Sequence, residues 1–193
     1  MSISEDGLRK NQANFASLSP LSFLERTRKT FPNQTAIEYK DYKLSYKQAG
    51  QRCDALANLI KNQNFNSGST IAVMLPNIPV MWECHFGVPM ATGVLNAINT
   101  RLDSHTVQFI LEHGEAKLFI YDSEYSPIVE KALVNLKNPP TVIEFVDEVA
   151  GNKRSNFANK VSCLDYETEL KNFTGTTFEH VLPNDEWNSI ALN

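Results

Sequence analysis

The stretch Thr70-Ile71-Ala72-Val73-Met74-Leu75 opens the part of the sequence that decides the fold. It is a short, continuous apolar run, which is typical of a strand buried on both faces of a sheet. Further predicted strands begin at Val94, Leu118 and Thr141, at nearly equal intervals, with helical patterns between them. This alternation predicts an α/β fold with an open, mostly parallel sheet, right-handed crossovers and flanking helices.

The sequence before this region predicts a helix, a hairpin and a second helix. Ser19-Pro20 supplies an N-cap and a first-turn proline for a helix that ends near Pro32. A strand over 35–39 returns through Lys43-Leu44. Ser45-x-x-Gln48 is a capping box for an amphipathic helix whose buried face carries Tyr46, Ala49, Cys53, Leu56 and Ile60.

Helix ends between the strands carry recognisable capping residues. Asn77 is the expected N-cap of the helix that Gly93 closes, and Asp103 or Ser104 is the expected N-cap of the next helix. Gly114 stands just beyond the end of that second helix. From Asp147 onward the chain becomes polar and irregular, with one short helix near 164–172.

For the whole chain we expect a loose arm over 1–18 and one partial domain over 19–193. The length of 193 residues, with 42% apolar and 21% charged residues, suits a single globular domain. A net charge of −4 without a basic stripe argues against nucleic acid as a partner.

The cysteines and the N-terminus predict a cytoplasmic protein. Cys53, Cys84 and Cys163 show no metal or redox spacing, and unpaired thiols suit a reducing compartment. The N-terminus lacks the apolar core of a signal peptide. The longest apolar run, 86–98, is too short and too broken by glycine and proline to form a transmembrane segment.

The usual nucleotide-binding and catalytic motifs are absent from this sequence. No two of the eight glycines stand two positions apart, so no Gly-x-Gly-x-x-Gly turn exists, and no Walker-type Gly-Lys-Ser/Thr is present. The four histidines show no zinc-site spacing. For His85 and His113 the pattern favours structural roles over catalysis, whereas His105 and His180 carry less signal.

Asn99-Thr100-Arg101 is the candidate binding segment. It follows a predicted parallel strand and precedes a helix, at the edge where open α/β sheets bind ligands and helix N-termini attract phosphate. Arg101 could hold an anionic group through a bidentate contact. Alternatively, it pairs with Asp103 or a glutamate and fixes the loop. Both interpretations stay open on these residues alone.

Several long stretches, in order, closely resemble the acyl-adenylate-forming enzymes, and among them the acyl-CoA synthetases. The longest is LPNIPVMWECHFGVPMATGVLNAINTRLD, over 75–103. The others are 18–26, 31–36, 110–118 and 185–193. Within the family, the resemblance is nearest to ligases for medium-chain fatty acids and for 3-methylmercaptopropionate.

The resemblance implies the first N-terminal subdomain of an acid–CoA ligase of fatty-acid metabolism. The complete enzyme would join a short- or medium-chain carboxylic acid to AMP from ATP, with Mg²⁺ neutralising the phosphates, and pass the acyl group to coenzyme A. In this family the phosphate loop Tyr-Thr-Ser-Gly-Thr-Thr-Gly-x-Pro-Lys-Gly follows the position of Asn193. The resemblance therefore implies a chain truncated before that loop, with neither a catalytic nor a metal-binding residue, and inactive alone.

The resemblance also bears on the candidate segment and on partners. In distantly related acetate ligases the loop that matches Asn99, Thr100 and Arg101 lies near the CoA nucleotide, so these three are the cofactor-binding candidates. A homodimer is compatible with the sequence. The alternative function is a non-catalytic module that binds an acyl or CoA ligand or pairs with a ligase subunit. Against it, Ile190-Ala191-Leu192 is expected to be an interior strand, and ending there would expose an apolar edge.

Overall fold

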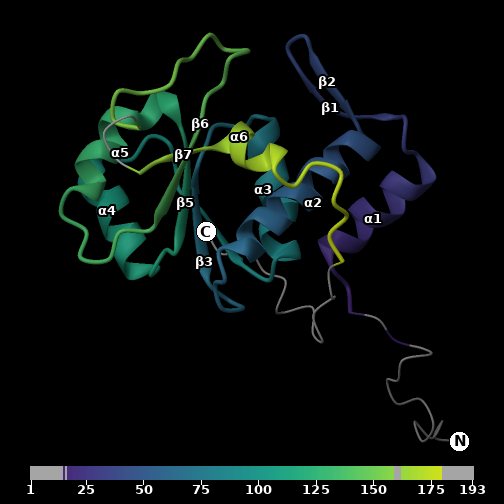
Figure 1. Ribbon diagram of the computed structural model, residues 1–193, viewed down its shortest axis with the longest axis horizontal. Helices are drawn as coiled ribbons and strands as arrows, with labels where there is room; N and C mark the ends of the chain where they lie inside the picture. The colour runs from purple at the N-terminus through teal and green to yellow at the C-terminus, as the bar shows by residue number, and fades with distance from the viewer. Residues whose placement is uncertain (1–14, 16, 159–161, 180–193) are drawn as a thin grey trace, which may run out of the picture.

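A parallel β-sheet forms the centre of the molecule (Figure 1). The computed structural model describes residues 15, 17–158 and 162–179. Within them the sheet has five strands in the order β4-β3-β5-β6-β7. The strands are β3 Thr70–Met74, β4 Val94–Ala97, β5 Leu118–Asp122, β6 Thr141–Phe145 and β7 Leu164–Asp165. All four predicted strand starts and the predicted α/β class are confirmed, whereas β7 lies in the stretch that was expected to be irregular.

Helices cover both faces of the sheet. α2 (Tyr46–Asn62), α3 (Pro79–Met90) and α6 (Tyr166–Lys171) pack on one face, and α4 (Ser104–His113) and α5 (Ser126–Leu133) on the other (Figure 1). Successive side chains of a strand point to opposite faces. In β3, Ile71 and Val73 therefore enter the core under α2 and α3, and Ala72 and Met74 enter the core under α4 and α5.

The strand order places a topological switch point between β3 and β5. The chain runs from β3 to β4 on one side of β3, and then returns to form β5 on the other side. In such doubly wound sheets the crevice beyond the carboxyl ends of the two strands at the switch point is the usual ligand site.

A helix and a hairpin precede the sheet. In α1 (Pro20–Thr30) the N-cap Ser19 accepts a hydrogen bond from Leu21 N at 3.3 Å, as predicted. β1 (Thr35–Tyr39) and β2 (Tyr42–Ser45) form a two-stranded antiparallel sheet. Ser45 and Gln48 form the predicted capping box at the start of α2. The predicted arm 1–18 and the strand expected at 190–192 lie almost entirely outside the described residues.

Two helix-end predictions need correction, both of them for α3. Ile78, not Asn77, is the N-cap of α3, because Pro79 suits the first helical position and holds the residue before it in an extended conformation. α3 ends at Met90, and Thr92 rather than Gly93 takes the left-handed φ of 62°. Of the two residues offered as N-cap of α4, Asp103 takes the position. Gly114 stands just beyond the end of α4, as predicted, with φ −79°, and the next residue, Glu115, takes the left-handed conformation at φ 47°.

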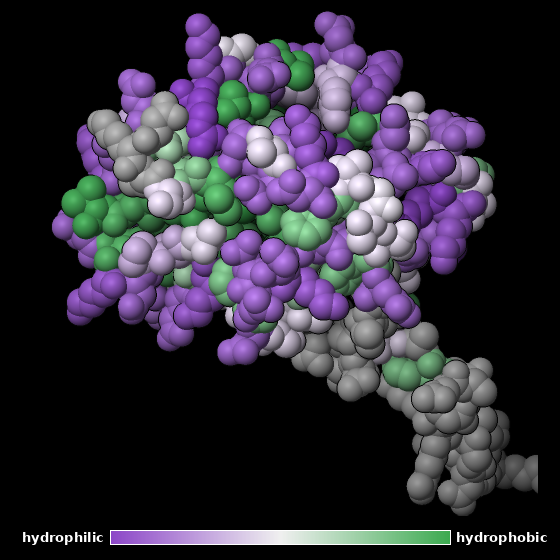
Figure 2. All heavy atoms as spheres, in the orientation of Figure 1, coloured by the Kyte–Doolittle hydropathy of each residue, from purple (hydrophilic) through white to green (hydrophobic). Residues whose placement is uncertain are grey.

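Apolar side chains gather over α4 and α5 on the left of Figure 2. Phe109 on α4 and Val134 just beyond α5 are exposed. Among the described residues no helix is long and apolar enough to cross a membrane.

Candidate functional site

The segment Asn99-Thr100-Arg101 lies where the sequence placed it, between β4 and α4 at the carboxyl edge of the sheet. Asn99 Oδ1 accepts a hydrogen bond from Arg101 N at 2.9 Å, which shapes the loop. At the start of α4, Thr106 N donates to Asp103 Oδ1 at 2.8 Å and lowers the pKa of that carboxyl group. Arg101 is exposed, and within the described residues it forms no ion pair, so the loop-fixing pair with Asp103 is not formed.

The histidines and cysteines have structural surroundings. His85 Nδ1 lies 2.7 Å from Met81 O one turn earlier, and His113 stacks on Phe109 with 5.4 Å between ring centroids. His180 lies outside the described residues. Burial raises the pKa of all three thiols, which makes a reactive thiolate unfavourable. Among the described residues no three His, Cys, Asp or Glu side chains group to hold a metal ion.

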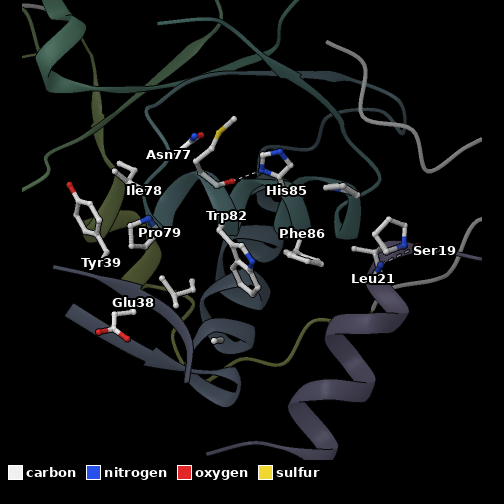
Figure 3. A pocket seen from close by; sticks show the side chains of 15 residues that line it. Ser19, Leu21, Glu38, Tyr39, Asn77, Ile78, Pro79, Trp82, His85 and Phe86 are labelled. Atoms are coloured by element: carbon white, nitrogen blue, oxygen red, sulfur yellow. Dashed lines mark hydrogen bonds between the residues drawn. The ribbon is translucent and has the colours of Figure 1, made fainter. Parts of the chain in front are cut away.

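An apolar groove of about 750 Å³ opens between α1, β1 and α3; we call it the hairpin groove. Its walls come from Ser19–Leu21, from 36–39 of β1, from Asn77 and Ile78, and from one side of α3 between Pro79 and Pro89. Figure 3 shows Glu38 and Tyr39 on the hairpin opposite Ile78, Pro79 and Trp82. Trp82 and Phe86 pack against each other with 4.6 Å between ring centroids. The few polar side chains, Asn77 and His85 among them, do not form a catalytic set.

A second cavity, of about 510 Å³, lies at the carboxyl ends of β6 and β7. A buried charged network borders it. Arg52 Nε donates to Glu83 Oε1 at 2.5 Å, and the Arg52 guanidinium binds both oxygens of Glu167. Tyr166 Oη donates to Glu83 Oε2 at 2.8 Å. The side chain of Glu83 is fully buried, and burial raises its pKa against the opposing effect of Arg52. This network ties α2, α3 and α6 together.

The network could not be assembled from the sequence. Arg52, Glu83 and Glu167 are separated by 31 and 84 positions, and no local motif links them. The available signal was Glu83 itself, because a lone carboxylate inside an apolar helix needs a buried partner. Its partner was not identifiable without the packing of α2 against α3.

Tyr39 lies between the two cavities and lines both of them, together with Ile78 and Pro79. Its hydroxyl donates to Asp147 Oδ2 at 2.7 Å, and Lys40 Nζ donates to Val149 O at 3.2 Å. These two contacts hold the hairpin against the loop that follows β6. Asp147 is almost completely buried, with its other oxygen accepting from Ala150 N.

Replacing Tyr39 with phenylalanine is expected to cost about 1–3 kcal/mol, because it leaves a buried carboxylate oxygen without its donor. The hydrogen bond to Asp147, and then burial, raise the Tyr39 pKa to about 12 from 10.0. The folded state therefore holds this proton more tightly than the unfolded state, and the contribution is complete below pH 10 and lost as the pH rises towards 12. Urea unfolding at neutral and alkaline pH measures this difference.

Tyr42→Phe is the control, since Tyr42 faces Tyr39 across the hairpin and its hydroxyl has no hydrogen bond within the described residues. An equal loss of stability in both variants at neutral pH would contradict the role of the Tyr39–Asp147 bond.

Sheet order, crossovers and flanking helices together define a doubly wound α/β domain. The family model for "AMP-binding enzyme" matches residues 24–185. The chain belongs to this family of AMP-binding enzymes, and the family resemblance seen in the sequence is confirmed.

The similar proteins are CoA ligases. An acetate–CoA ligase from Humulus lupulus is 36% identical over 97% of this chain and 34% of its own length. A peroxisomal acetate/butyrate–CoA ligase from Arabidopsis thaliana is 34% identical over the same shares. The crystal structure of the anthranilate–CoA ligase AuaEII with anthranoyl-AMP superposes with a TM-score of 0.76 at 18% identity, over 90% of this chain and 32% of that chain, and shows the shared fold. This chain thus spans about a third of the length of these relatives.

Proposed function

We propose that this chain is the amino-terminal part of an acid–CoA ligase that activates a short- or medium-chain carboxylic acid with ATP and passes the acyl group to coenzyme A. The observation that carries the proposal is the 36% identity to a CoA ligase over 97% of the chain. Relatives named for acetate, butyrate and trans-cinnamate support a small carboxylic acid as the substrate class. The first 18 residues are proposed as an arm and 19–193 as part of the adenylate-forming domain.

ATP, Mg²⁺ and coenzyme A are the proposed cofactors of the complete enzyme. The described residues bring no group of metal-binding side chains together. The phosphate-loop motif of the family is absent from the 193 residues. We therefore expect the chain alone to form no acyl-adenylate. A cytoplasmic location is proposed, although several relatives are peroxisomal by name.

Acid-dependent exchange of pyrophosphate into ATP tests this function. The source DNA should be read past the codon for Asn193, and the product of any continuous reading frame assayed beside the 193-residue chain. Activity in the longer product alone supports the proposal. If the 193-residue chain alone catalyses the exchange of pyrophosphate into ATP, the expectation that it is inactive by itself is contradicted. A stop codon with no downstream ligase sequence favours the alternative of a non-catalytic acyl- or CoA-binding module.

Arg101→Ala is expected to weaken CoA binding by the complete enzyme about tenfold, since a charged hydrogen bond to an anionic group contributes about 1.5–3 kcal/mol. The guanidinium of Arg101 is exposed at the carboxyl edge and has no ion-pair partner among the described residues, which supports a role for Arg101 beside Asn99 and Thr100. Lys137→Ala is the matched control, because Lys137 is exposed beside the amino ends of the strands. Titration with CoA gives both affinities. If the Arg101→Ala variant binds CoA with unchanged affinity, the proposed role of Arg101 in CoA binding is wrong.

A further inference from the structure

One edge of β1 has no partner strand in the described part of the chain, and this edge borders the hairpin groove. Four consecutive residues of this strand, 36–39, line the groove. Successive side chains of a strand point to opposite faces, so a groove on one face would contact only every second residue. A groove that contacts four consecutive residues therefore runs along the edge of the strand. Within the described residues, β2 is the partner of β1 on its other side. The backbone donors and acceptors of the free edge therefore face an apolar groove.

The hairpin geometry identifies the residue whose backbone faces outward. Lys40 and Asp41 form a two-residue turn, with Tyr39 opposite Tyr42 and Glu38 opposite Lys43. In such a hairpin the pair beside the turn exchanges hydrogen bonds, and the next pair does not. The N–H and C=O of Glu38 therefore point away from β2, and those of Lys43 point away from β1. Glu38 is on the groove side.

The groove suits one additional strand. The β1 sequence Thr-Ala-Ile-Glu-Tyr has high strand propensity and contains one charged residue, Glu38. Lys43 Nζ pairs with Glu38 Oε1 at 2.9 Å. Neither a proline nor a lysine protects this edge. Across the groove, Trp82 and Phe86 offer an apolar wall. The edge is recessed between α1 and α3, so a single extended segment fits there more easily than the folded hairpin of a second copy.

We propose that an extended segment with one apolar face adds to the β1 edge as a third strand, and that the part of the ligase with no counterpart in this chain supplies it. Relatives extend over about three times the matched length, which provides such a segment. Two-stranded sheets are marginal alone, whereas three strands packed on helices are stable. The inference rests on family membership and is independent of the acid substrate and of CoA binding.

Overlapping synthetic peptides from the unmatched two-thirds of the Humulus lupulus acetate–CoA ligase are the probe. Each is titrated into the ¹⁵N-labelled 193-residue chain, and backbone amide shifts are followed by NMR. We expect at least one peptide to shift the amides of 36–39. Glu38→Pro removes the outward N–H without removing a bond to β2 and should abolish the shifts. Lys43→Pro is the matched control: it loses the same exposed ion pair but keeps the groove edge, and its affinity should remain within about twofold.

Trp82→Ala tests the apolar wall of the hairpin groove independently of the β1 edge. We expect the Kd for the peptide to rise at least about tenfold, because an aromatic residue at the centre of an interface contributes strongly to binding. Unchanged spectra away from the substituted residue show that each variant is folded. The proposal is overturned if no peptide shifts 36–39, or if Glu38→Pro and Lys43→Pro weaken binding equally. Shifts at 36–39 that depend on protein concentration without peptide would identify a second copy as the occupant and also overturn it.

Discussion

Replacing Arg52 with methionine is expected to lower the free energy of unfolding by about 3–5 kcal/mol, the largest single effect that we predict. The reason is Glu83, whose side chain is fully buried and would lose its counter-ion. Tyr166 Oη would remain as its hydrogen-bond donor at 2.8 Å, and one neutral donor does not compensate a buried charge. Urea unfolding at neutral pH measures the loss.

The same variant should show a characteristic pH dependence. Burial already raises the Glu83 pKa above its usual 4.5, and removing Arg52 takes away the main effect that lowers it. Between the unfolded and folded pKa values the folded state binds more protons, so stability falls as the pH rises through this window. The loss in Arg52→Met should therefore be smallest below about pH 4.5 and should grow at higher pH.

Two further variants separate buried charge from lost packing. Arg52→Met combined with Glu83→Gln should recover most of the stability, because the amide is neutral and still accepts from Tyr166. Glu167→Gln should cost at most about 1 kcal/mol, since that side chain is 41% exposed. A double variant no more stable than Arg52→Met would contradict the buried-charge explanation.

Gly87→Ala is expected to destabilise the protein by about 1–3 kcal/mol, although alanine is the better helix former. A Cβ at Gly87 on α3 would meet Leu56 Cδ2 at 2.8 Å and Leu56 Cβ at 3.0 Å on α2. Leu56 is completely buried in the main core, and its Cβ cannot move away without displacing α2. Thermal or urea unfolding would detect this loss.

A double-mutant cycle with Leu56 tests this mechanism. Leu56→Ala alone should cost about 2–5 kcal/mol by opening a cavity. In the double variant the added methyl group occupies part of that space, so the combined loss should be smaller than the sum of the two single losses. Additive losses would show that the two residues do not compete for the same volume.

Local patterns in the sequence determined a large part of this fold. Short apolar-rich segments at nearly equal intervals marked the starts of β3, β4, β5 and β6, and the pattern is most continuous in β3 and β5, which are buried on both faces. Ser19 and Ser45 marked helix starts, because a cap is satisfied by residues two or three positions away. The family was also recognisable, since its long motifs are contiguous.

Interactions between distant segments were decided by the tertiary structure alone. β7 has only two residues and pairs with β6 across an irregular stretch, so it has no periodic signal. The Tyr39–Asp147 bond joins residues 108 positions apart, and the Arg52–Glu83 pair depends on how α2 crosses α3. Strand order and the groove beside β1 likewise follow from how the elements pack together. Sequence periodicity shows which side of an element is buried, and only packing decides what that side contacts.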